Sequence, residues 1–128
     1  TYLNLEFPEL IPMLDSSQKG HPLVPAGGCR DFFLHLKEDK LQDAISLLQE
    51  PLAEKAEVHK VHDLLEAGFF GHSVSENLRS RIGNLVILPY YGESVWWYEK
   101  NRFEQNMLGH HGGLTREEME IPLLALCL

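Results

Sequence analysis

The sequence predicts a small α+β domain, α/β-like in character, with a mixed sheet of three to five strands and two to four short helices. Short apolar segments predict strands, and apolar residues spaced three and four positions apart predict a helix. Glycines and prolines separate these segments. With 128 residues, 44% hydrophobic and 23% charged, the chain is long and apolar enough for one core, so we expect a single domain over residues 1–128.

The first 28 residues show no sustained periodicity and are predicted to be an irregular entry segment. They contain four prolines and three glycines: Pro8, Pro12, Pro22, Pro25, Gly20, Gly27 and Gly28. An α+β region is expected over residues 29–108. It opens with a strand over 29–36, in which alternation places Phe32, Leu34 and Leu36 on one face.

A helix is predicted to begin near Asp39. Its apolar stripe consists of Leu41, Ala44, Ile45, Leu48 and Leu52. Pro51 leaves two alternatives, because proline lacks a backbone donor and clashes with the preceding turn. Either the helix stops near Glu50, or a new helix starts with Pro51 in its first turn.

A second strand is predicted from the alternating residues 56–61, followed by a short helix over 62–67 that Gly68 ends. Ser75 is placed to cap another short helix, which should run through Arg81.

The continuous apolar run Leu85–Leu88 is typical of a strand buried on both faces. Tyr91-Gly92-Glu93 is expected to turn the chain back, so that residues 94–98 complete a hairpin with this strand.

Charge and composition disfavour several partners. The chain has 11 basic and 19 acidic residues, a formal net charge of −8, which repels a nucleic-acid backbone. It contains no apolar run of 18 residues and no signal-peptide pattern, so no membrane association is expected. Its two cysteines, Cys29 and Cys127, form no disulfide framework, which favours a reducing, cytoplasmic location.

Residues 109–123 carry the most informative pattern. Thr115 and Glu118 have the spacing of a capping box, which predicts a short helix from Arg116. Gly112 and Gly113 allow the backbone before it to approach another group closely. Two interpretations stay open: a tight loop-to-helix turn with exposed histidines, or a loop that holds a histidine against a phosphate or a metal ion.

The segment His111-Gly112-Gly113-Leu114-Thr115-x-Glu117-Glu118-Met119-x-Ile121-Pro122-Leu123 resembles the closing motif of the alkaline phosphatase superfamily, in its type I phosphodiesterase and nucleotide pyrophosphatase branch. Three further segments resemble strands and strand entries of that branch: 30–35, 68–71 and 79–88. The similarity covers residues 29–125, with Asn84 where the branch has Asp. It implies an alkaline-phosphatase-like C-terminal fragment of a larger hydrolase.

In this superfamily the histidine of the closing motif is one ligand of a two-metal site, so the resemblance implies that His111 binds a divalent metal, zinc or alternatively manganese. No catalytic residue is carried over to the chain itself, because the nucleophile and the other ligands have no match here. The resemblance therefore implies a metal-dependent phosphoesterase acting on a small-molecule phosphate ester. It also implies that the missing N-terminal catalytic portion of the same polypeptide is the partner of this fragment, which alone is expected to be inert and to hold no metal.

Residues 109–128 are expected to form the closing His-Gly-Gly loop, a short helix and a terminal strand. An uncovered strand over 121–128 would leave an exposed edge, which favours a homodimer. His110 is not expected to join the site, because adjacent side chains on an extended loop point apart.

Trp96, Trp97 and Arg81 are the candidate substrate-binding residues. The two tryptophans either stabilise the predicted hairpin by cross-strand pairing or form an aromatic wall for a base or sugar. Arg81 could contact a phosphate, or lie as an exposed helix charge. The alternative function is a non-catalytic binding or interaction module that reuses the same fold.

Overall fold

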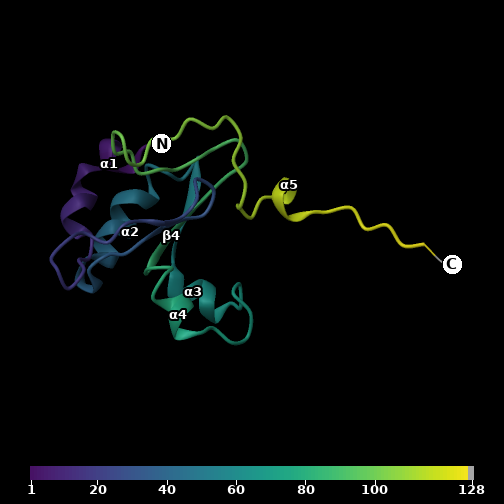
Figure 1. The fold of residues 1–128 in the computed structure, drawn as a ribbon, viewed down its shortest axis with the longest axis horizontal. Coiled ribbons are helices and arrows are strands. Elements are labelled where there is room, and N and C mark those ends of the chain that lie inside the picture. The colour runs from purple at the N-terminus through teal and green to yellow at the C-terminus, as the bar shows by residue number, and fades with distance from the viewer. Residues whose placement is uncertain (127–128) are drawn as a thin grey trace.

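The structure, a computed structural model, describes residues 1–126 and has the predicted α+β class. Figure 1 shows a body made of the sheet and its helices, with the last helix and the segment after it extending to one side. The elements in chain order are α1 (Leu3–Glu6), η1 (Pro8–Met13), β1 (Ala26–Gly27), β2 (Phe32–Leu34), η2 (Glu38–Lys40), α2 (Leu41–Gln49), β3 (Ala56–Lys60), α3 (Val61–Glu66), α4 (Glu76–Arg79), β4 (Leu85–Pro89) and α5 (Arg116–Met119). Within residues 1–126 these seven helices, two of them 3-10 helices, exceed the two to four predicted.

The four strands form one sheet in the order β1-β2-β4-β3. Every neighbouring pair is antiparallel, so the expectation of a mixed sheet was wrong. Phe33 and His59 flank Val86 from the two sides, which fixes the register of β4 between β2 and β3.

The two central strands are buried on both faces, as the run Leu85–Leu88 predicted. Phe32, Leu34, Leu85 and Ile87 belong to the main core, together with buried residues of α1, η1 and α2. Phe33 and Val86 belong to a second core with Val61, Leu64 and Ile82. The alternation of strand side chains therefore divides one apolar run between two cores.

Helix α2 packs on the main core through Ala44, Ile45 and Leu48, the stripe that the sequence predicted. It ends at Gln49, which confirms the first of the two alternatives for Pro51. The Ser75 hydroxyl accepts a hydrogen bond from the Leu78 backbone N–H at 3.2 Å, as expected of a cap. The helix that it caps is shorter than predicted and ends at Arg79.

The predicted hairpin between Leu85–Leu88 and residues 94–98 does not form. Both edges of β4 are already paired, with β2 and with β3, so no edge remains for a returning strand. Residues 94–96 instead lie beside the N-terminus: Leu3 N–H donates to the Trp96 carbonyl, and Trp96 N–H donates to the Thr1 carbonyl, each at 2.9 Å.

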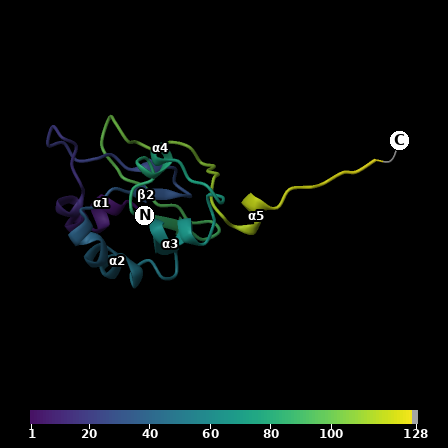
Figure 2. The same cartoon turned by 90° about the horizontal axis from the view of Figure 1, so that it is seen from below.

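The N-terminal segment is more ordered than predicted, since residues 1–28 include α1, η1 and β1. The reason is burial, because Leu3, Leu10 and Leu14 pack into the main core. At the other end, residues 120–126 have no strand, contrary to the predicted terminal strand over 121–128, whose last two residues lie outside the described part. Figures 1 and 2 both show this tail extended away from the body.

Candidate functional site

The candidate site is the loop at residues 109–115, together with helix α5. The backbone at Gly112 has φ +102°, a conformation that favours glycine, so this residue makes the bend after His111. Gly113 is buried, and a Cβ there would overlap the Glu118 carboxylate. His111 itself is exposed, whereas His110 is half-buried. The two glycines therefore let the loop close on its own helix while the imidazole of His111 stays accessible.

The loop is held by an ion pair between Arg30 and Glu118. The guanidinium donates from Nε to Glu118 Oε1 at 3.0 Å and from Nη2 to Oε2 at 2.8 Å, a two-pronged arrangement. The side chains are 7% and 16% exposed, so the pair is largely removed from water. The third guanidinium nitrogen, Nη1, donates to the backbone carbonyls of Tyr90, at 2.8 Å, and of Glu93. Every nitrogen of the fork thus has a partner, as a buried charge requires.

The pKa of Glu118 is lowered from 4.5 to about 2. The hydrogen bonds from Arg30 are the largest cause, and burial acts in the opposite direction. The Thr115 hydroxyl, at 2.8 Å, and the Gly113 N–H, at 3.1 Å, add further hydrogen bonds to this carboxylate. Glu118 is therefore ionised at neutral pH.

These contacts correct the predicted capping box. Helix α5 begins at Arg116, as expected, with Thr115 at the cap position. The Thr115 side chain, however, makes no bond to the helix backbone and donates instead to Glu118 Oε2. The Glu118 carboxylate faces Arg30, because a charged fork is a stronger partner than a backbone N–H.

Asp31 lies against the loop at Gly112. Its Oδ1 atom accepts a hydrogen bond from Gly28 N–H at 2.8 Å. A Cβ at Gly112 would lie 3.5 Å from that oxygen, so the bend packs against the carboxyl group. Burial raises the pKa of Asp31, and the nearby negative charge of Glu118 adds to the rise, while a positive charge on His111 opposes it. The bend that follows His111 therefore packs against the Asp31 carboxyl group.

An imidazole and a carboxylate are both common zinc ligands, so His111 and Asp31 have suitable donor chemistry. A zinc site takes three or four protein ligands. Within residues 1–126 no three His, Cys, Asp or Glu side chains are grouped closely enough to hold an ion. The described residues therefore do not by themselves form a complete zinc site.

His110 is half-buried, next to His111 on the loop. It lines a hollow of about 490 Å³ with Arg30, Tyr91, Thr115 and Glu117 among its walls. His111 is not among the residues that line this hollow.

Of the predicted substrate-binding residues, Trp96 and Trp97 pack together against the main core, whereas Arg81 lies elsewhere. Trp96 is half-buried against the main core: its Nε1 donates to the Phe103 carbonyl at 2.9 Å, and its ring meets the edge of Phe32 at 5.8 Å between centroids. Trp97 lines a groove between residues 4–25 and 97–103. Arg81 is exposed just after α4. The structure brings none of the three into the hollow beside His110.

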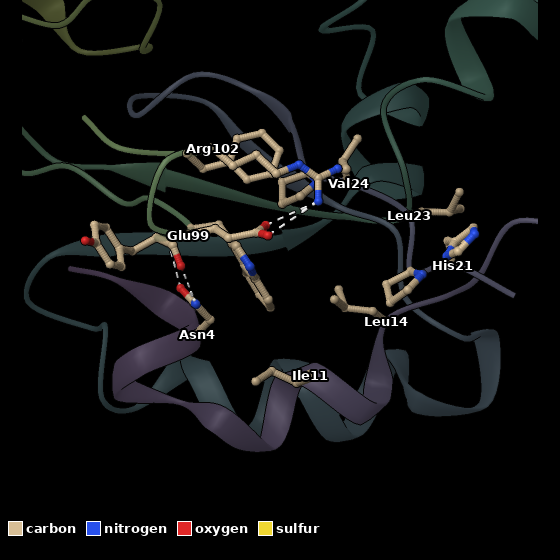
Figure 3. Close-up of a pocket in the computed structure, with 13 residues that line it drawn as sticks. Asn4, Ile11, Leu14, His21, Leu23, Val24, Glu99 and Arg102 are labelled. Atoms are coloured by element: carbon tan, nitrogen blue, oxygen red, sulfur yellow. Dashed lines mark hydrogen bonds and ion pairs between the residues drawn. The ribbon is translucent and has the colours of Figure 1, made fainter. Parts of the chain in front are cut away.

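The groove at Trp97 has a volume of about 470 Å³ and lies between residues 4–25 and 97–103. Figure 3 shows Asn4 and the Glu99–Arg102 pair along one side and Leu14, His21 and Leu23 along the other. The Asn4 side-chain amide donates to the Tyr98 carbonyl at 2.7 Å and accepts from the Tyr98 N–H at 2.8 Å. These two bonds tie Tyr98 to α1. Trp97 is thus half-buried beside a groove whose lining residues are separate from those of the His111 loop.

Asn84 has a structural role in this chain. Its amide donates to the Leu36 carbonyl at 2.8 Å and accepts from the Leu36 N–H at 2.9 Å. This pairing continues the ladder between β2 and β4 by one side chain, a role in which the amide supplies both a donor and an acceptor.

Sequence reasoning gave Arg30 no role, although it is the residue around which the loop is organised. The only sequence signal was an arginine two residues before the apolar run Phe32–Leu34, and arginine at such a position is more often exposed. The spacing of Thr115 and Glu118 predicts a local helix cap, so it indicates no distant partner for the Glu118 carboxylate.

Comparison of this chain with protein-family models, with curated proteins and with solved structures finds no match. None of the helices in residues 1–126 combines the length and the apolar character needed to cross a bilayer.

Proposed function

We propose that this chain is the C-terminal part of a metal-dependent phosphoesterase of the type I phosphodiesterase and nucleotide pyrophosphatase branch, and that His111 supplies one metal ligand. The observation that carries the proposal is the arrangement of the loop. Glu118 and Arg30 fix its base to the body, while His111 stays exposed one residue before the bend at Gly112, which packs against the Asp31 carboxyl group. A purely structural turn needs no exposed histidine at its bend.

In this proposal His111 would hold a zinc or manganese ion, which when bound would polarise the phosphoryl oxygens of a small phosphate ester. Asp31, which packs against the bend at Gly112, would be a nearby carboxylate. The nucleophile and the remaining ligands belong to a preceding portion of the same polypeptide, so the chain alone hydrolyses nothing. Its two cysteines, of which Cys29 is a buried free thiol, suit a cytoplasmic enzyme.

The test uses the intact gene product. The reading frame before Thr1 should encode a Ser or Thr nucleophile and an Asp-His-Gly motif. In that protein His111→Ala should lower the zinc or manganese content, measured by plasma mass spectrometry, and should reduce hydrolysis of bis-p-nitrophenyl phosphate at least 100-fold. His110→Ala is the matched control, because it removes the neighbouring imidazole from the same loop. Equal behaviour of the two variants, or a start codon at this point of the gene, refutes the proposal.

A non-catalytic interaction module is the second candidate, and the exposed tail favours it. Ile121, Leu123, Leu124 and Leu126 are 84%, 92%, 84% and 77% exposed, which is unusual for consecutive apolar residues in water. In a phosphoesterase this tail would pack on the preceding portion of the polypeptide; in an interaction module it would bind another protein or a second copy. An intact protein that hydrolyses no phosphate ester, and whose self-association is lost when residues 121–128 are removed, would favour the module.

A further inference from the structure

Arg30 is unusual among residues 1–126 because its charged group is buried, in the bend just before the central strand β2. Its side chain is 7% exposed. Its guanidinium joins three segments that are far apart in the sequence: the bend between β1 and β2, the turn at residues 90–93 and helix α5. The residue therefore acts where the C-terminal segment meets the body.

The attachment of that segment depends on Arg30. Among the hydrogen bonds of residues 106–126, those that reach the body all start from the Arg30 guanidinium. The other bonds of this segment, such as Gly113 N–H to Glu118 and Arg116 to Glu120, stay inside it. Figure 1 shows α5 to one side of the body, with the tail leading away from it.

Glu118 transmits this attachment to the loop. Its Oε1 atom accepts from Gly113 N–H at 3.1 Å, and its Oε2 atom accepts from the Thr115 hydroxyl at 2.8 Å. Gly113 is two residues from His111, so one carboxylate links the guanidinium to the bend that presents the imidazole. Asp31, the residue after Arg30, meets the same bend at Gly112.

We infer that Arg30 is a positioning residue for His111: its two-pronged contact with Glu118 sets where the His111 imidazole lies relative to the rest of the metal site. The inference rests on the proposed function. A lysine cannot replace the arginine, because an ammonium group is a single point charge and cannot bond both carboxylate oxygens and two carbonyls in a fixed plane.

The experiment combines two variants with a matched control. Arg30→Lys keeps the charge and removes the fork, and Glu118→Gln keeps the shape and removes the carboxylate. The control is Glu120→Gln, which breaks the exposed pair Arg116–Glu120 on the same helix. Hydrogen exchange is measured on this chain, and zinc affinity is measured on the intact gene product by competition with a chromogenic chelator.

In Arg30→Lys and Glu118→Gln, exchange over residues 109–119 should rise about tenfold or more while the amides of β2 and β4 stay protected. Zinc affinity should fall about 10-fold to 100-fold, the usual effect of losing a group that orients a metal ligand. The control should change neither measurement. Two different substitutions keep the test valid if one of them fails to fold.

Unchanged exchange in both variants overturns the inference. Faster exchange with unchanged zinc affinity also overturns it, provided that His111→Ala lowers the affinity, and in that case the proposed function stands. If His111→Ala leaves the affinity unchanged, the proposed function fails, and the positioning of a metal ligand by Arg30 fails with it.

Discussion

Two glycines with the same backbone conformation should respond differently to alanine, because their neighbours differ. Gly83 has φ +61° and Gly68 has φ +80°, both in the left-handed region. A Cβ on Gly83 would overlap the Leu34 backbone carbonyl in β2, whereas a Cβ on Gly68 would have no atom within 4 Å. The pair therefore separates the conformational cost of a side chain from its steric cost.

The magnitudes follow from these surroundings. At Gly68 an alanine costs the left-handed conformation alone, about 1 kcal/mol. At Gly83 the same cost applies, and the overlap with Leu34 adds about 2 kcal/mol, typical of forcing extra volume into a packed interior. The overlapping atom belongs to the backbone of a central strand, which also accepts the Asn84 N–H at 3.0 Å, so it cannot move without disturbing the sheet. We expect Gly83→Ala to cost about 3 kcal/mol and to lower the Tm by about 10 °C.

The assay is urea unfolding followed by circular dichroism, with Gly68→Ala and the unsubstituted chain measured in parallel. The m-value should stay constant, so that the midpoint reports stability. Equal destabilisation by the two alanines would show that the contact with Leu34 has no energetic weight, and would refute the reasoning from the Cβ position.

Three further predictions concern a titration, a side-chain pairing and the tail. Because the pKa of Glu118 is lowered from 4.5 to about 2 on folding, its contribution to stability is complete above pH 4.5 and is lost as the pH falls towards 2. Since the carboxylate is partly exposed, we expect this contribution to be about 2 kcal/mol. The urea midpoints of Glu118→Gln should lack this part of the acid dependence, and acid profiles identical to those of the unsubstituted chain would contradict the prediction. Asn84→Asp removes the donor to the Leu36 carbonyl and should lower the free energy of unfolding by about 2 kcal/mol at pH 7. Part of this loss should be recovered at pH 3, where the protonated acid can donate. An equal loss at both pH values would contradict the prediction. The apolar tail should drive self-association, so sedimentation at high concentration should show a dimer that disappears when residues 121–128 are removed. A monomer both with and without these residues would contradict this prediction.

The sequence by itself determined the features that depend on local pattern. The run Leu85–Leu88 specified a strand covered on both faces, and the stripe from Leu41 to Leu48 specified the buried face of α2. Ser75 fixed the start of a helix because its hydroxyl reaches a backbone N–H three residues away. Such features rest on contacts within one turn or along one strand, so the order of residues encodes them directly.

The loop at His111 was found from its glycines and its motif, but the group that holds it was not. Thr115 and Glu118 have the spacing of a capping box, and nothing near them in the sequence shows that a guanidinium 88 residues away competes for the carboxylate. The candidate site was therefore predicted as a segment, while its attachment was missed.

The tertiary structure alone decided which segments become neighbours. Residues 94–98 had the composition of a strand, yet both edges of β4 were taken by β2 and β3, and the segment pairs with the N-terminus instead. The role of Arg30 likewise depends on the tertiary structure, because the fold brings both the turn at residues 90–93 and helix α5 to its guanidinium. Strand edges and buried charges select partners by geometry across the whole chain, and a local pattern contains no information about which partner is nearest.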